Sequence, residues 1–106
     1  MERLYTVVRS DLNFGLKAAQ STHAVCEFQE KYGELYKVWH ASYKTIVHLE
    51  SDDIWSLAKA ATEAGIPCAL NFEPDLGGKL TSVAFGAAAK KLLRSLPLLG
   101  AMQAAA

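Results

Sequence analysis

Apolar residues recur along the chain with two different periods, which predict strands and helices in turn. Residues Leu4 to Arg9 are apolar at nearly every position and rich in β-branched side chains. Such a run is typical of an interior strand that is covered on both faces. Further strands are expected over Thr45 to Leu49, Cys68 to Phe72 and Lys79 to Phe85, because these runs are short, apolar and bounded by turn residues.

Between these runs, apolar residues recur with the spacing of an α-helix. Leu16 to Tyr32 is expected to form a long helix, capped by Asp11 or Asn13. Its predicted inward face holds four residues: Ala18, Val25, Phe28 and Tyr32. Three shorter helices are expected over Glu34 to His40, Ile54 to Ala64 and Ala87 to Leu96.

The order β-α-α-β-α-β-β-α predicts one α/β domain over residues 1–106, with a four-stranded mixed sheet and helices on both faces. Helix-sized connections after the first two strands favour parallel neighbours, whereas the short third connection favours an antiparallel pair. Residues 100–106 are small, and we expect them to be a frayed tail.

Composition narrows the class of protein. The chain has 106 residues, of which 51% are hydrophobic and 21% are charged. This composition is typical of a globular domain and excludes intrinsic disorder. No apolar run reaches the ~18 residues of a membrane span, so we expect a cytoplasmic protein with no membrane contact. Cys26 and Cys68 fit no metal or redox spacing and are expected to be buried, reduced thiols. We expect no metal and no cofactor.

Charge is balanced overall but not along the chain. Eleven basic and eleven acidic residues cancel and the pI is about 6.8, which excludes a protein that coats nucleic acid by charge alone. After Asp75 the chain has no acid, only the bases Lys79, Lys90, Lys91 and Arg94. This segregation allows a local basic face on a neutral protein.

The segment Glu73 to Gly78 holds the most suggestive polar residues. It places two acids and two glycines at the end of a predicted strand, where α/β sheets commonly carry their sites. The same residues also suit a plain turn. Of the histidines, His23 lies on the polar side of the first helix near Gln20, and His48 lies within a strand as a surface or partly bonded residue.

Several short motifs follow one another in a recognisable order. They are R-x-D-L at Arg9 to Leu12, A-A-Q-x-x-H-A at Ala18 to Ala24, A-G-I-P at Ala64 to Pro67, D-x-G from Asp75, and T-x-x-x-x-G at Thr81 to Gly86. Together they resemble the type II peptidyl-tRNA hydrolase family, over roughly residues 4–99. The short turn before Ala18 and the E-P-D-L-G loop resemble a bacterial branch of that family.

The resemblance implies hydrolysis, by water, of the ester between a peptide and the terminal ribose of tRNA, with tRNA as the partner. The catalytic candidates it implies are Lys17, Gln20, His23 and Asp75. The substrate-binding candidates are Thr81, Lys79, Lys90 and Arg94, of which the bases are available for phosphate contacts.

Two other interpretations stay open. One is a non-catalytic RNA- or ligand-binding domain. It is favoured by the zero net charge and by the short turn, which places Leu16, and not Lys17, at the position of the family's functional lysine. Gln20, His23 and Asp75 favour the enzyme. The other is a small-ligand pocket at the Asp75 loop. A homodimer also stays open as a further partner.

Overall fold

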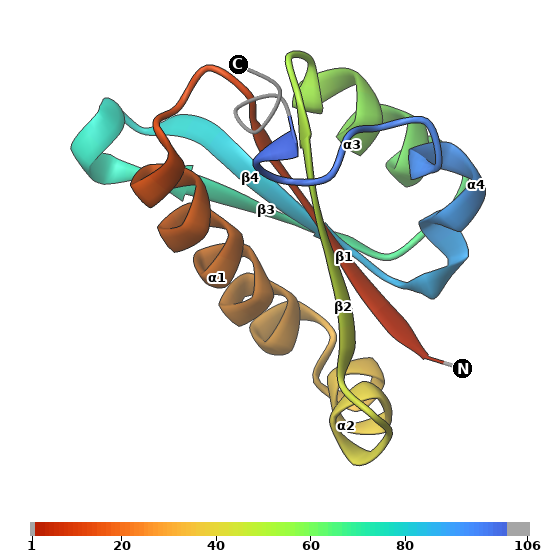
Figure 1. The fold of residues 1–106 in the computed structure, drawn as a ribbon. Coiled ribbons are helices and arrows are strands. Elements are labelled where there is room, and N and C mark those ends of the chain that lie inside the picture. Colours follow the sequence, from red (N-terminus) through yellow and green to blue (C-terminus); the bar gives the residue numbers. More distant parts are fainter. Residues whose placement is uncertain (1, 102–106) are drawn as a thin grey trace.

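The sheet has four strands in the spatial order β2-β1-β4-β3. The computed structural model describes residues 2–101, and its strands are β1 (Arg3–Arg9), β2 (Thr45–Ser51), β3 (Cys68–Glu73) and β4 (Lys79–Phe85). β1 runs parallel to β2 and antiparallel to β4, and β3 runs antiparallel to β4. The predicted mixed sheet is confirmed, with β1 in its interior (Figure 1).

Helices cover both faces of this sheet (Figure 1). One face carries α1 (Phe14–Lys31) and α2 (Gly33–Ala41), and the other carries α3 (Ile54–Glu63) and α4 (Lys90–Leu93). Two 3-10 turns, η1 (Pro74–Leu76) and η2 (Ala87–Ala89), lie between β3 and β4 and before α4. The α/β architecture therefore has three layers, as its element order predicts.

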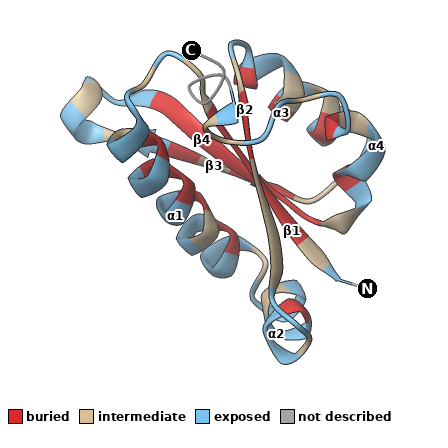
Figure 2. Cartoon of the chain, viewed as in Figure 1, coloured by how far each residue is buried: buried red, intermediate tan, exposed pale blue. Residues whose placement is uncertain are grey.

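The buried residues form one apolar cluster on each side of the sheet, and β1 contributes to both. Tyr5 and Val7 pack into the cluster under α3 and α4. Leu4 packs on the other side with Phe28 of α1 and Trp39 of α2. Figure 2 shows the resulting line of buried residues along the strands. This double contact is why β1 is apolar at both alternations of its sequence.

Helix α1 begins close to where the sequence indicates, and its predicted inward face is borne out at Phe28 and, in part, at Val25 and Tyr32, which pack against the same cluster. The Asn13 side chain accepts a hydrogen bond from the Leu16 amide at 2.9 Å and caps the helix. The predicted inward face is wrong at Ala18, which is exposed. Cys26 is exposed too, so only Cys68 is a buried thiol. The fully buried residues of α1 are Lys17, Gln20, Ser21, Ala24 and Phe28, so the helix is inward at polar positions in its first half.

The C-terminal segment also differs from its prediction. The helix expected over Ala87 to Leu96 is only η2 and the single turn of α4, since Pro97 disfavours helical backbone in the residue before it. Beyond it, Leu99 donates its amide hydrogen to the His48 carbonyl at 2.9 Å, and Leu98 forms an antiparallel bridge with Leu49. The prediction of a frayed tail over residues 100–106 is thus wrong at Gly100, whose amide donates a hydrogen bond to Glu50. Residues 102–106 lie outside the described residues.

Candidate active site

The contact between α1 and the sheet is polar at its amino-terminal half. Lys17, Gln20 and Ser21 each expose only 2% of their surface there. The facing strands supply matching polar residues, among them Glu50, Asn71, Thr81 and Ser82. Buried polar groups are costly unless they are hydrogen-bonded, so the partners of each side chain determine how α1 sits on the sheet.

Gln20 lies at the centre of the larger of two polar networks. Its Oε1 accepts hydrogen bonds from Thr81 Oγ1 at 2.5 Å and from Asn71 Nδ2 at 2.9 Å. Its Nε2 donates to Glu73 Oε2 at 2.9 Å, and its backbone carbonyl accepts from Ser82 Oγ at 2.7 Å. With both ends of the amide occupied, the Gln20 side chain is fixed in one orientation.

A β-bulge brings Thr81 into this network. The pairing of β3 with β4 shifts between Asn71 and Phe72, so that Asn71 pairs with Ser82 while Phe72 pairs with Leu80. Thr81 is the extra residue, and its hydroxyl turns to the same side as Asn71 and Gln20. Bulges redirect side chains in this way at the rims of sheets.

Glu73 is the carboxylate that this network holds. Besides the Gln20 amide, the backbone amide of Asp75 donates to Glu73 Oε1 at 3.2 Å. These hydrogen bonds, the one from Gln20 first, lower the pKa of Glu73 below its usual range, and the nearby His23 adds to the effect. His23 Nδ1 lies 3.5 Å from Glu73 Oε2, and the His23 side chain is 51% exposed. Glu73 is thus ionised beside an accessible imidazole.

Lys17 belongs to a second, separate network. Its Nζ donates to Glu50 Oε2 at 3.1 Å, and these two side chains are 2% and 1% exposed. The same oxygen accepts the Gly100 amide at 3.1 Å, while Glu50 Oε1 has no hydrogen-bond partner among the described residues. Of the catalytic candidates, Gln20 therefore lies against Glu73 at the start of the Asp75 loop, whereas the Lys17 ammonium turns to Glu50 of β2.

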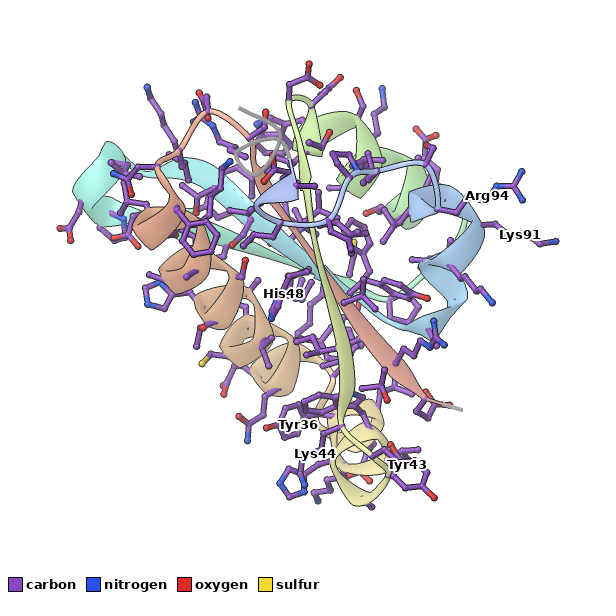
Figure 3. All side chains as sticks on the ribbon, in the orientation of Figure 1. Tyr36, Tyr43, Lys44, His48, Lys91 and Arg94 are labelled. Atoms are coloured by element: carbon purple, nitrogen blue, oxygen red, sulfur yellow. The ribbon has the colours of Figure 1, made fainter. Side chains whose placement is uncertain are left out.

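The remaining predicted residues lie at two ends of the molecule. Asp75 is exposed in η1, and Lys79 is exposed at the start of β4, opposite Glu73 in the strand pairing. Lys90 and Arg94 are exposed at α4, on the far side of the domain from η1 (Figures 1 and 3). A bound RNA would have to extend across the domain to contact both groups.

His48 makes a third polar contact on the α1 face of the sheet. Its Nδ1 lies 2.5 Å from Thr6 Oγ1, its partner residue in the pairing of β1 with β2. Burial lowers the pKa of His48, which is therefore uncharged near neutral pH. Figure 3 shows His48 between α1 and β2, where the sequence suggested a partly bonded strand residue.

Four side chains that contribute to these networks were absent from the sequence-based candidates: Glu50, Asn71, Glu73 and Ser82. Glu73 shares the E-P-D loop with Asp75, and the sequence-based candidates took only Asp75 from that loop. Glu50 carried one usable signal, since an acid that directly continues an apolar strand needs a buried partner.

The sequence matches no protein family model and no curated protein. Its fold is similar to that of a solved structure, a protein of unknown function from Agrobacterium tumefaciens. The two chains are 14% identical with a TM-score of 0.70, over 92% of this chain and 96% of that chain. At this identity the likeness shows the fold alone.

No group of three or more His, Cys, Asp or Glu side chains in the range 2–101 is arranged to hold a metal ion. Of the helices in the described part of the chain, none combines the length and the apolarity needed to cross a membrane.

Proposed function

We propose that this protein is a cytoplasmic hydrolase that cleaves the ester between a peptide or aminoacyl group and the terminal ribose of tRNA. The observation that carries the proposal is the contact of Gln20 and His23 with Glu73. This contact joins the A-A-Q-x-x-H-A helix to the loop of Asp75, two of the segments that carry the resemblance to type II peptidyl-tRNA hydrolases.

The chemistry needs a base that takes a proton from water, and His23 has the surroundings for that role. A carboxylate beside Nδ1 favours the tautomer with its proton on that nitrogen, which leaves the lone pair on Nε2. Nε2 then accepts a proton from water as the water oxygen attacks the ester carbonyl. When the bond from carbonyl carbon to ribose oxygen breaks, His23 returns the proton to the ribose oxygen.

The other residues of the network act by positioning this pair. Gln20, held by Asn71 and Thr81, fixes the Glu73 carboxylate against the imidazole. Asp75 is exposed in the next turn and is available to accept a hydrogen bond from water or from a ribose hydroxyl. Since Lys17 is buried against Glu50, we assign it to holding α1 in place rather than to contact with substrate.

A second candidate function is a non-catalytic RNA-binding domain with the same fold, and the burial of Lys17 favours it. A lysine that is 2% exposed and paired with a carboxylate offers no charge to a substrate carbonyl or phosphate. In this alternative the network around Gln20 serves stability alone, and tRNA binds without being cleaved.

The experiment is release of a labelled N-acylated amino acid from charged tRNA by the purified protein. We expect His23→Gln to slow release about a hundredfold, as loss of an acid–base group typically does. Glu73→Gln should slow release as well, because the imidazole loses the carboxylate that orients it. His40→Gln, which changes an exposed histidine on α2, is the matched control and should keep the wild-type rate. Asp75→Asn tests the loop acid that the family resemblance implies.

Each outcome of this assay selects one function. No release above the spontaneous rate, together with binding of uncharged tRNA, would establish the non-catalytic alternative. Release that is unaffected by both His23→Gln and Glu73→Gln would remove this pair from the mechanism.

A further inference from the structure

A hollow of about 530 Å³ lies on the α3 side of the sheet, which is the face away from the Gln20 network. It opens where β1 and β2 end, between Arg9 of β1, Asp52 after β2 and Lys79 of β4. Its volume is that of a small-molecule site. In open α/β sheets, ligands bind at the carboxyl ends of parallel strands where the chain leaves in opposite directions, and β1 is at that point here.

Two exposed aromatic rings form one wall of the hollow. Trp55 of α3 is 58% exposed and Phe72 of β3 is 48% exposed, and their ring centroids lie 6.0 Å apart at an angle of 55°. Leu80, which is buried, lines the same hollow. A flat aromatic ligand that stacks on Trp55 would remove this apolar surface from water.

The charged groups around the hollow differ in whether they already have partners. Arg9 donates to Asp11 through two nitrogens, at 3.0 and 2.5 Å, and the Asp53 side chain caps α3 by accepting a hydrogen bond from the Ser56 amide. The side chains of Asp52 and Lys79 make no hydrogen bond or ion pair with any residue in the range 2–101, although the pKa of Asp11 is lowered by the hydrogen bond from Arg9 and, further, by the charge of Lys79. These two exposed side chains, of opposite charge, are therefore available to a ligand.

From this arrangement we propose that the hollow binds a ribonucleoside unit, either as a free nucleotide or as the 3′ end of an RNA. The base stacks on Trp55, and the Asp52 carboxylate accepts hydrogen bonds from the ribose hydroxyls, which are donors that a carboxylate can bind in pairs. The Lys79 ammonium faces the 5′ phosphate. Three acids and two bases line the hollow, so the base and ribose carry most of the affinity and the phosphate adds little.

This inference does not depend on the proposed ester hydrolysis, because the hollow and the His23–Glu73 pair lie on opposite faces of the sheet. The test is therefore equilibrium binding with no ester present. The probes are adenosine, AMP, 2′,3′-dideoxyadenosine and a short single-stranded RNA whose 3′ end is either free or phosphorylated. Calorimetry gives the affinity, and quenching of Trp55 fluorescence reports stacking, since the other tryptophan, Trp39, is buried.

We expect adenosine and AMP to bind with similar affinity, and Trp55→Ala to weaken both about tenfold or more. Asp52→Ala should weaken adenosine several-fold and leave dideoxyadenosine unchanged, because only adenosine offers hydroxyls to the carboxylate. Tyr43→Ala, which removes an 88% exposed ring beside α2 (Figure 3), is the matched control and should bind adenosine like wild type. Thermal unfolding of each variant checks that it folds.

The RNA arm identifies the source of the nucleoside. Tighter binding of the RNA with a free 3′ end than of the phosphorylated one points to an RNA terminus, and equal binding of AMP and RNA points to free nucleotides. The proposal is overturned if neither adenosine nor AMP shows saturable binding, or if folded Trp55→Ala binds them as wild type does.

Discussion

The ammonium of Lys17 lies 3.1 Å from the carboxylate of Glu50, and neither side chain exposes more than 2% of its surface. The pair joins the first turns of α1 to the end of β2, two segments that are 33 residues apart in the chain. Removing two charges from water is costly, and their attraction offsets that cost only while both partners are present. The pair therefore specifies where α1 sits as much as it stabilises the fold.

Our first prediction concerns this pair. Lys17→Met should lower the free energy of unfolding by about 3–5 kcal/mol, because it leaves the Glu50 carboxylate buried without its cation. The double variant Lys17→Met, Glu50→Gln should recover much of that loss, since glutamine is uncharged and still accepts the Gly100 amide. Urea unfolding of the single and double variants measures the coupling. Additive effects of the two substitutions would show that the pair contributes no specific interaction.

The second prediction concerns Tyr5, whose hydroxyl is buried with no hydrogen-bond partner among the described residues. A buried polar group without a partner costs free energy, so Tyr5→Phe should raise the free energy of unfolding by about 1 kcal/mol. The matched control is Tyr32→Phe, because the Tyr32 hydroxyl bonds both the amide and the carbonyl of Cys68, each at 3.3 Å. Thermal unfolding should move in opposite directions for the two variants. A lower melting temperature for Tyr5→Phe would contradict the assignment.

The third prediction is a pH dependence that arises at His48. Burial lowers its pKa in the folded state from the usual 6.5, so the unfolded chain binds a proton more readily than the folded one. Stability is then fully present above about pH 6.5 and falls as the pH drops below it, toward the lower folded pKa. His48→Asn should flatten the unfolding free energy between pH 7 and pH 5, while His40→Asn, at an exposed site, should keep the wild-type slope. Equal slopes in wild type and His48→Asn would exclude His48 as the source.

The fold was accessible from the sequence because local patterns agreed with the global arrangement. In β1, the residues that point to either face of the sheet are apolar, because both faces of that strand pack against helices. The stripe of α3, with Ile54, Ala58 and Ala61 inward, follows the same logic. In both elements the residues that face the core are the apolar ones, so periodicity and burial coincide.

The face of α1 was not accessible in this way. Periodicity treats Lys17 and Gln20 as outward residues, whereas their partners on β2, β3 and β4 draw them inward. Those partners lie 33 to 61 residues away in sequence, and a β-bulge turns one of them, Thr81, toward the helix. No spacing rule predicts such a bulge. The same reasoning explains why Glu73, rather than Asp75, proved to be the acid that the network holds.

The last prediction concerns the bases at α4. Lys90 and Arg94 lie one helical turn apart and are exposed, and no acid follows Asp75 in the chain to neutralise them. If tRNA binds there, each phosphate contact that is lost should reduce the slope of log affinity against log salt by about 0.7–0.9. The measurement is tRNA affinity over a salt series for wild type, for Lys90→Ala with Arg94→Ala, and for Lys37→Ala with Lys44→Ala. The second pair lies on and after α2, so it removes the same charge from another part of the surface and controls for net charge.

The α4 variant should also separate binding from cleavage, because α4 lies across the domain from α1 and the Asp75 loop (Figure 1). It should bind full-length tRNA less tightly and yet cleave a short aminoacylated oligonucleotide at the wild-type rate. Equal salt slopes for the two double variants would place the RNA contact elsewhere than α4.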